Sequence, residues 1–379
     1  MMCVMEKPAV YLLCNKLWAF IIFMEKREKI MSLLQDTIRK IDSLDQEMTA
    51  QARERVNQLI KPPTSLGRLE DLAVQLAGIT RNIFPVVDNK AIIVMAGDHG
   101  VYEEGVTKNP QEVTYAQTMH FAKGTTGVCA IGKVSGARIV PVDVGIKVDL
   151  PENSGVINRK IKYGTDNMAK GPAMTREEAI KSIETGIEIA NEEIKKGVNL
   201  LGTGEMGIGN TTPSTAILSV IGNIEPIEIT GRGAGLGAGG REHKANVIKK
   251  AIELNKPNRE DGIDVLAKVG GLEIGGMAGV MLAAAANKIP VVIDGYISTA
   301  AALIAAAIEP KAKEYMITSH ASAEIGGQKA SELLGIKPML YIDLCLGEGS
   351  GAALAFPIVE AACSMMKNMV TFAEVGMEI

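Results

Sequence analysis

The sequence alternates short apolar runs with longer segments of helical periodicity, and this alternation limits the folds that it can adopt. Five runs have the length and apolar character of buried parallel strands, at residues 91–100, 138–146, 198–205, 290–295 and 315–320. Between the second and third of them, residues 175–197 predict a helix, with capping-box spacing of Thr175 and Glu178 and a stop at Gly197. The pattern therefore predicts an α/β fold, in which helices cover both faces of a Rossmann-like, mostly parallel sheet.

The two ends of the chain differ from this middle part. The apolar stretch 9–23 is too short to span a bilayer, and we expect residues 1–30 to be a peripheral extension. Helical periodicity dominates the segments on either side of the strand-containing region. We predict a smaller, mainly helical domain from residues 31–86 and 337–379, beside a large α/β domain of residues 87–336 that carries the nucleotide site.

Composition narrows the class of partner. A net charge of -4 and a pI near 5.8 provide no basic surface for nucleic acid or anionic lipid. Glycine is abundant, with 40 residues, whereas aromatic residues make up 4%, so we expect a small ligand that is recognised mainly by the backbone. The five cysteines are scattered and form no Cys-x-x-Cys pair, which argues against a disulfide framework and favours a cytoplasmic protein.

Polar residues follow the predicted strands at their carboxyl ends, where ligands collect in open parallel sheets. They are Asp98, His99, Glu205, Asp294, Ser319 and His320. With four histidines in the chain and no cysteine or carboxylate at ligand spacing, we expect no metal site and interpret His99 and His320 first as structural residues.

The segment LGTGEMGIGNTTPSTAIL, at residues 201–218, places one carboxylate, Glu205, in a glycine-rich loop before a predicted helix. Backbone N–H groups and hydroxyls there suit a phosphate at a helix N-terminus begun by Pro213. The predicted phosphate-binding residues are Gly207, Ile208, Gly209, Asn210, Thr211 and Thr212. A tight turn that needs positive φ explains the loop equally well. The spacing lacks the acidic residue of a dinucleotide site and the lysine of an ATP-binding P-loop.

A second glutamate, Glu348, lies between glycines in LGEGSGAALAFP at residues 346–357. A single glutamate is usually solvated or caps a helix, but two in apolar-flanked glycine loops indicate acid and base roles. Arg232 and Lys244 are candidates for a phosphate, although exposed basic residues on helices are more often simply solvated. No Gly-x-Ser-x-Gly elbow supports a hydrolase triad.

Eight segments, taken together, resemble a known family. They are KPPTSLGRLE, DHGVYEEGVTKNPQEVT, GEMGIGNTT, GRGAGL, GGLEIGGMAG, DGYISTAAAL, SHASAE and LGEGSGAALAFP, in this order from about Leu59 to Thr371. They are similar to the motifs of the nicotinate-nucleotide:dimethylbenzimidazole phosphoribosyltransferase family. The resemblance implies transfer of the 5-phosphoribosyl group of nicotinate mononucleotide to a benzimidazole base in cobalamin nucleotide-loop assembly, with nicotinate and alpha-ribazole 5'-phosphate as products.

The resemblance also implies roles for individual residues. Glu348 is the expected general base, and Glu205 is expected to hold ribose hydroxyls or to support that base. The phosphate is expected to meet the 207–212 loop, Ser322 and Lys244. The expected aromatic pocket includes Gln111, Met206 and Leu346, and Asp294 is expected near the ribose or the base.

The family implies no metal or cofactor and a homodimer. Two alternatives stay open, namely another phosphoribosyl transferase or hydrolase and a non-catalytic nucleotide sensor on the same fold.

Overall fold

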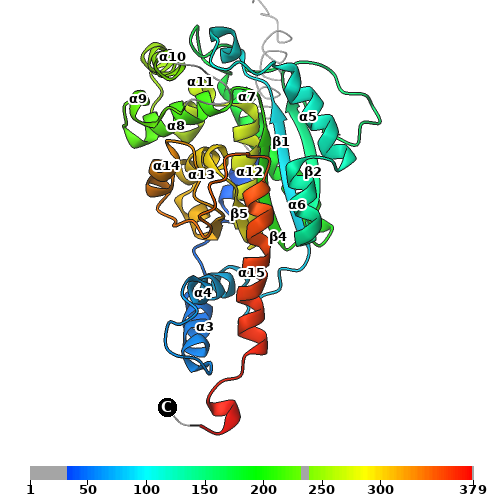
Figure 1. The fold of residues 1–379 in the computed structure, drawn as a ribbon, viewed down its shortest axis with the longest axis vertical. Helices are drawn as coiled ribbons and strands as arrows, with labels where there is room; N and C mark the ends of the chain where they lie inside the picture. The colour runs from blue at the N-terminus through cyan, green and yellow to red at the C-terminus, as the bar shows by residue number, and fades with distance from the viewer. Residues whose placement is uncertain (1–31, 232–238, 378–379) are drawn as a thin grey trace, which may run out of the picture.

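The computed structural model describes residues 32–231 and 239–377, which are drawn as a ribbon in Figure 1. The expected peripheral extension of residues 1–30 lies outside this part, as does Arg232. None of the helices in the two described ranges combines the length and the apolar character that crossing a membrane requires.

A six-stranded sheet forms the centre of the molecule (Figure 1). Its strands are β1 (Lys90–Gly97), β2 (Arg138–Gly145), β3 (Ile157–Asn158), β4 (Leu200–Met206), β5 (Val291–Ile293) and β6 (Met316–Thr318). Neighbouring strands all pair in parallel, in the order β3-β2-β1-β4-β5-β6. From β1 the strand order runs to one edge of the sheet through β2 and β3, and from β4 to the other edge through β5 and β6. The point between β1 and β4 is the topological switch point, where open parallel sheets bind ligands.

All five predicted strands are present, so the predicted parallel sheet is confirmed. Strand β3 was not predicted, because a strand of two residues leaves no apolar run in the sequence. Strand β5 ends at Ile293, earlier than the predicted run, because the chain turns at Asp294 and Gly295 into the next helix.

Helices pack on both faces of this sheet (Figure 1). The helices of the described residues are α2 (Leu33–Ile38), α3 (Gln46–Gln58), α4 (Arg68–Thr80), α5 (Glu112–Lys123), α6 (Gly127–Ser135), α7 (Arg176–Lys195), α8 (Thr211–Gly222), α9 (Pro226–Ile229), α10 (Gly240–Asn255), α11 (Gly262–Val269), α12 (Leu272–Ala286), α13 (Tyr296–Ile308), α14 (Gly327–Leu334) and α15 (Ser350–Asn368). Short 3-10 helices span Gly100–Glu104, Pro310–Tyr315 and Ala373–Val375.

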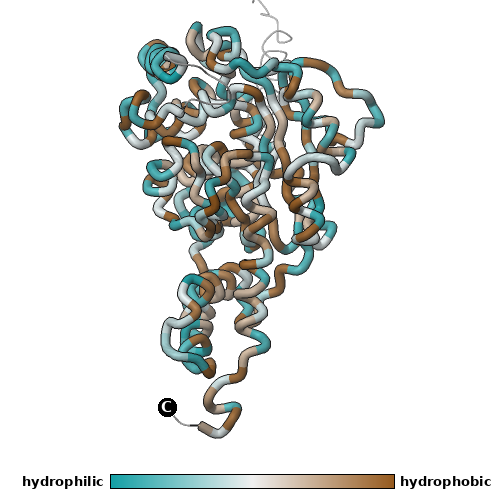
Figure 2. The backbone as a smooth tube through the Cα atoms, in the orientation of Figure 1, coloured by the Kyte–Doolittle hydropathy of each residue, from teal (hydrophilic) through white to brown (hydrophobic). Residues whose placement is uncertain are grey.

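The core has two layers, one on each face of the sheet. Ile93 and Met95 of β1 belong to a hydrophobic cluster with residues of α7 and α12, whereas Ile92 and Val94 belong to a second cluster with residues of α4 and α15. Successive side chains of a strand point to opposite faces, so both faces of β1 are buried by helices, as predicted. Figure 2 shows hydrophobic segments along the central strands and hydrophilic ones along α10.

Helices α3 and α4 lie with the C-terminal part of α15 at one end of the molecule (Figure 1). Helix α4 contacts both α3 and α15, and Leu59 forms an antiparallel bridge with Thr371. The two terminal segments therefore pack against each other beside the sheet. Their treatment as a separate smaller domain, with the boundaries given above, stays a prediction.

The long helix α7 begins and ends as its sequence predicts. The Thr175 hydroxyl accepts the N–H of Glu178 at 3.1 Å, and the Glu178 carboxylate accepts the N–H of Thr175 at 2.9 Å. Gly197, just beyond the helix, has φ +92°. The capping box and the glycine stop are therefore confirmed.

Candidate active site

The carboxyl ends of β4, β5 and β6 open into a cavity of about 540 Å³. Its volume is in the range of small-molecule sites. The predicted site residues that line it are Glu205, Met206, Gly207, Ile208, Gly209, Asn210, Thr211, Asp294, Ser322, Leu346 and Glu348. Gln111, Thr212 and Lys244 lie outside this lining.

Glu205 is buried at the end of β4. Burial raises its pKa to about 8, and the charges of Asp294 and Glu273 act in the same direction. The Asn210 side-chain amide donates to Oε2 of Glu205, and the Glu348 N–H donates to Oε1 at 3.3 Å. At neutral pH, Glu205 therefore holds a proton and presents a neutral carboxyl group to the cavity.

Glu348 reaches the same cavity from the loop before α15. Its Oε1 accepts a hydrogen bond from the Gln117 amide on α5, and its Oε2 accepts the Val128 N–H at 3.1 Å. Val128 lies in the first turn of α6, where N–H groups and the helix dipole favour a negative charge. The carboxylate of Glu348 is thus oriented by neutral donors from two helices, while its backbone contacts Glu205.

The loop after β4 uses part of its backbone for its own fold. The Ile208 N–H donates to the Thr114 hydroxyl at 3.0 Å, and the Asn210 N–H donates to the Gly207 carbonyl at 3.1 Å. The expectation that both N–H groups are free for a phosphate is therefore wrong, although both residues line the cavity. Gly209 has φ +92°, so the tight-turn interpretation holds for this glycine.

Helix α8 begins at Thr211, two residues before the expected Pro213. The Lys244 ammonium group, which is buried, donates to the Thr211 hydroxyl at 2.5 Å. Burial lowers the pKa of Lys244 to about 8. Thr212 is fully buried beside them, and its hydroxyl has no hydrogen-bond partner among the described residues. A cation behind the cavity lining therefore contacts a hydroxyl in that lining at a helix N-terminus, which is a suitable arrangement for a phosphate.

The structure places Gln111 away from the cavity. It precedes α5, where its amide donates to the His99 carbonyl at 3.1 Å and its carbonyl accepts from Lys147 at 3.4 Å. Gln117, six residues further, lines the cavity instead. Six residues rotate a helix by about 240°, so the two glutamines point in different directions.

Sequence reasoning missed Gln117 and Thr114. Val113 and Gln117 both line the cavity and are four residues apart, which is the spacing of one helix face. This spacing is the signal that would have identified Gln117 from the sequence, if the first residue of the helix had been predicted correctly. The tertiary contact of Thr114 with the Ile208 N–H left no such signal.

The two histidines at strand ends have different surroundings. His99 is fully buried, and its Nε2 lies 3.0 Å from a carboxylate oxygen of Glu273. His320 lines the cavity, and its Nδ1 lies 3.0 Å from the Ser319 hydroxyl. Burial lowers the pKa of His320, so its ring is neutral at pH 7. In the described ranges, no three His, Cys, Asp or Glu side chains gather as a metal site requires.

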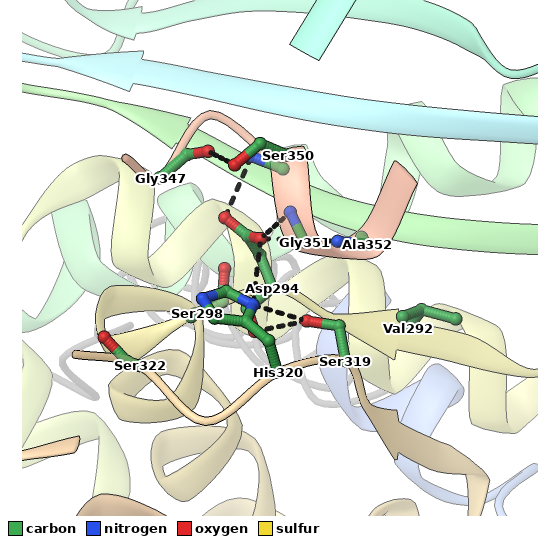
Figure 3. A network of polar contacts seen from close by, with 12 residues as sticks. Val292, Asp294, Ser298, Ser319, His320, Ser322, Gly347, Ser350, Gly351 and Ala352 are labelled. Atoms are coloured by element: carbon green, nitrogen blue, oxygen red, sulfur yellow. Dashed lines mark hydrogen bonds and ion pairs between the residues drawn. The ribbon is translucent and has the colours of Figure 1, made fainter. Parts of the chain in front are cut away.

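Asp294 follows β5 and points its carboxylate at the first turn of α15 (Figure 3). Oδ2 accepts the Gly349 N–H at 3.0 Å, and Oδ1 accepts those of Gly351 and Ala352 at 2.7 and 3.3 Å. Burial raises the pKa of Asp294 to about 7, against the opposing effect of these N–H groups. The residue therefore lines the cavity while its oxygens are engaged by the loop that carries Glu348.

Comparison with known proteins gives a consistent result. The model of a phosphoribosyltransferase family matches residues 41–377. A nicotinate-nucleotide–dimethylbenzimidazole phosphoribosyltransferase from Alkaliphilus metalliredigens is 72% identical over 92% of this chain and all of its own length, and one from Clostridioides difficile is 55% identical over 92% of this chain and 99% of its own length.

A crystal structure of the enzyme of that name from Thermus thermophilus superposes with a TM-score of 0.84 at 38% identity, covering 89% of this chain and all of its own. The fold class and the family inferred from the motifs are thereby confirmed. The chain belongs to the nicotinate-nucleotide–dimethylbenzimidazole phosphoribosyltransferase family.

Proposed function

We propose that this protein transfers the 5-phosphoribosyl group of nicotinate mononucleotide to 5,6-dimethylbenzimidazole or a related base, giving alpha-ribazole 5'-phosphate and nicotinate. One observation carries the proposal: Glu205 and Glu348, 143 residues apart, line a single cavity beside the buried Lys244. The names of the close relatives support the same substrates.

The proposed reaction is a displacement at C1 of the ribose. A ring nitrogen of the benzimidazole uses its lone pair to form a bond to this carbon, while the bond from the carbon to the pyridinium nitrogen breaks. The electron pair of the broken bond stays on the pyridine nitrogen, which makes the nicotinate ring neutral. The base thereby becomes a cation, and the N–H on its other ring nitrogen becomes acidic and loses its proton. Alignment of the two rings on opposite sides of the sugar supplies most of the rate.

In this proposal Glu348 accepts the proton of the attacking base. Its oxygens accept hydrogen bonds from the Gln117 amide and the Val128 N–H, so the carboxylate has a defined orientation before the substrate binds. General-base catalysis by a carboxylate positioned in this way accelerates a reaction by about 10²- to 10⁴-fold. The side chains of Met206 and Leu346 provide apolar walls for the flat ring.

Glu205 and Lys244 have complementary proposed roles. Glu205, protonated at neutral pH, donates a hydrogen bond to a ribose hydroxyl, whereas Lys244, Thr211 and Ser322 bind the phosphate. A dianionic phosphate near the Lys244 ammonium group favours its charged form and offsets the cost of its burial.

The direct test is to incubate the purified protein with nicotinate mononucleotide and 5,6-dimethylbenzimidazole and to measure nicotinate and the ribosylated base by chromatography. We expect equimolar release of the two products. Nicotinate released at the same rate without a base would indicate a hydrolase. Binding of nicotinate mononucleotide with no product, in the presence of several bases, would indicate a nucleotide sensor and overturn the proposal.

We also propose a cytoplasmic homodimer. The described cysteines, Cys129, Cys345 and Cys363, are free thiols, which suits a reducing compartment. Tyr341 and Ile342 are exposed apolar residues near the cavity loop and provide area for a second copy. Light scattering during size-exclusion chromatography measures the mass of the particle, and a monomer at micromolar concentration would contradict the dimer.

A further inference from the structure

The backbone that carries Glu348 is strained. Gly347, Glu348 and Gly349 have φ values of 87°, 64° and 94°, three successive residues in the left-handed region. Glycine adopts this region freely, but for a residue with a side chain it is unfavourable. Such a conformation persists at a site only when the surrounding structure holds it in place.

The helix that follows has no cap of its own. The N-cap position of α15 is Gly349, which has no side chain to accept the N–H groups of the first turn. By contrast, α11 has Asp261 as its N-cap residue. Oδ1 of Asp261 accepts the N–H groups of Ile263 and Asp264 at 3.0 and 3.1 Å. A serine, threonine or aspartate at the N-cap usually provides these bonds.

Asp294, the residue after β5, supplies the missing cap from 55 residues before Gly349 in the chain. Its Oδ1 accepts the N–H groups of Gly351 and Ala352, which are the second and third residues of α15, and its Oδ2 accepts the N–H of Gly349 (Figure 3). The Ser319 hydroxyl donates to the Asp294 carbonyl at 2.7 Å and so holds the backbone of the capping residue as well.

The neighbours of Asp294 leave no room for a looser arrangement. A Cβ at position 351 would lie 2.8 Å from Oδ1 of Asp294 and would overlap the His320 ring. The charged or titratable groups that face Asp294 are Glu348 and Glu205 across the cavity and His320, whose Nδ1 lies 3.9 Å away. The Asp294 carboxylate therefore uses its hydrogen-bonding capacity on the backbone of the loop that carries Glu348.

We propose that Asp294 is a positioning residue that caps α15 from β5 and thereby holds the strained loop in which Glu348 faces the cavity. This inference rests on the proposed function, in which Glu348 accepts the proton of the base. It differs from the sequence-based expectation for Asp294, because its oxygens act on the Glu348 loop and not on the ribose or the base.

The test is the exchange Asp294→Asn, alone and combined with Glu348→Gln. The amide keeps the volume of the side chain but offers one acceptor to three N–H groups. We expect kcat to fall about a hundredfold, since a displacement of about 1 Å at a reacting group has this effect, with KM for nicotinate mononucleotide changed less than about threefold. If Asp294 acts through Glu348, the double variant is no slower than Glu348→Gln. Losses that multiply in the double variant would show that Asp294 acts on the substrate and would overturn the proposal.

A second measurement does not depend on turnover. Hydrogen exchange of the Gly349, Gly351 and Ala352 amides is expected to accelerate in Asp294→Asn, and unchanged exchange would contradict the cap. Absence of product with the unaltered protein would overturn the proposed function, but this exchange experiment would still test the cap.

Two further variants keep the experiment decisive. Asp261→Ala removes an ordinary aspartate cap and is expected to lower the melting temperature with kcat unchanged. If Asp294→Asn does not fold, Asp294→Ser, which fits the space and still accepts one N–H, is expected to show the same fall in kcat. Full activity of Asp294→Ser would overturn the proposal.

Discussion

The loop after β4 and the loop before α15 each place one glutamate among glycines at the same cavity, but they do so by different means. Glu205 ends a regular strand and is surrounded by other carboxyl groups, so burial leaves it protonated at neutral pH. Glu348 lies on a strained backbone, and its oxygens receive N–H donors from α5 and α6. Similar local sequence therefore yields a buried glutamate with a raised pKa in one loop and a glutamate oriented by two N–H donors in the other.

The largest expected effect comes from a matched pair of exchanges. Glu348→Gln is expected to lower kcat about 10³-fold, since the amide cannot accept the proton of the attacking base. Glu205→Gln is expected to lower kcat about tenfold or less at pH 7. Glu205 already holds a proton there, and an amide also donates a hydrogen bond once Asn210 turns its own amide to match.

Steady-state kinetics with nicotinate mononucleotide and a benzimidazole base compare the two variants. Near-equal values of kcat for Glu205→Gln and Glu348→Gln would remove the distinction between the loops.

A smaller effect is expected from adding a methyl group to the strained loop. At Gly347, φ is +87°, and a Cβ would overlap the Glu205 carboxylate. An alanine in the left-handed region costs roughly 1 to 2 kcal/mol, and Gly347→Ala is expected to lower the free energy of unfolding by more than this because of the added overlap. The same exchange is expected to lower kcat about tenfold or more. Gly105→Ala is the control, because Gly105 has φ +69° and nothing lies within 4 Å of its added Cβ.

Urea unfolding of both variants separates the two contributions. Equal losses of stability for Gly347→Ala and Gly105→Ala would indicate that the two glutamate loops do not contact each other as tightly as the structure shows.

The protonation of Glu205 also predicts how stability depends on pH. Its pKa is about 8 in the folded protein against a usual value of 4.5, so between these values the folded state holds a proton that the unfolded state releases. The free energy of unfolding therefore falls as pH rises through this window, by at most about 1.4 kcal/mol per pH unit for one proton. Glu205→Gln is expected to flatten this fall.

Chemical unfolding at pH 5.5 and pH 8.5 measures the difference between Glu205→Gln and the unaltered protein. Asp294, whose pKa is also raised, interacts with Glu205, so the difference between the two proteins reports Glu205 together with its coupling to Asp294. A parallel pH dependence of the two proteins would show that Glu205 is ionised in the fold.

Much of this arrangement follows from the sequence, because it depends on local patterns. Apolar runs predicted β1 and β4, and their polar ends predicted which edge of the sheet holds the site. Glu205 and Glu348 were identifiable because glycines flank both and each adjoins a predicted element. The roles proposed for them remain predictions until the variants are measured.

The remaining features depend on tertiary contacts that no local pattern encodes. The Ile208 N–H donates to Thr114 of α5, and the cap of α15 comes from Asp294, the residue after β5. The sequence analysis named Gln111 for the aromatic pocket, whereas Gln117 is the glutamine of α5 that lines the cavity. Which of two glutamines faces the cavity depends on the residue at which the helix begins, and boundaries are the least certain part of a sequence-based prediction.

The smallest expected effect tests the donors that orient Glu348. Gln117→Leu removes the amide that donates to Oε1 of Glu348 but leaves the Val128 N–H on Oε2, so one of two bonds to the carboxylate is lost. A hydrogen bond to a charged group contributes about 1.5 to 3 kcal/mol, and we expect kcat to fall about tenfold. Gln111→Leu is the matched control, since its bond to the His99 carbonyl lies outside the cavity lining.

Measurement of kcat for both leucine variants distinguishes the two glutamines. Gln111→Leu is expected to lower stability slightly and to leave kcat unchanged. A larger loss of kcat in Gln111→Leu than in Gln117→Leu would mean that the loop at His99, and not the α5 face at the cavity, controls Glu348. The contrast between a strand-end glutamate fixed by its own loop and a glutamate oriented by distant helices would then have to be abandoned.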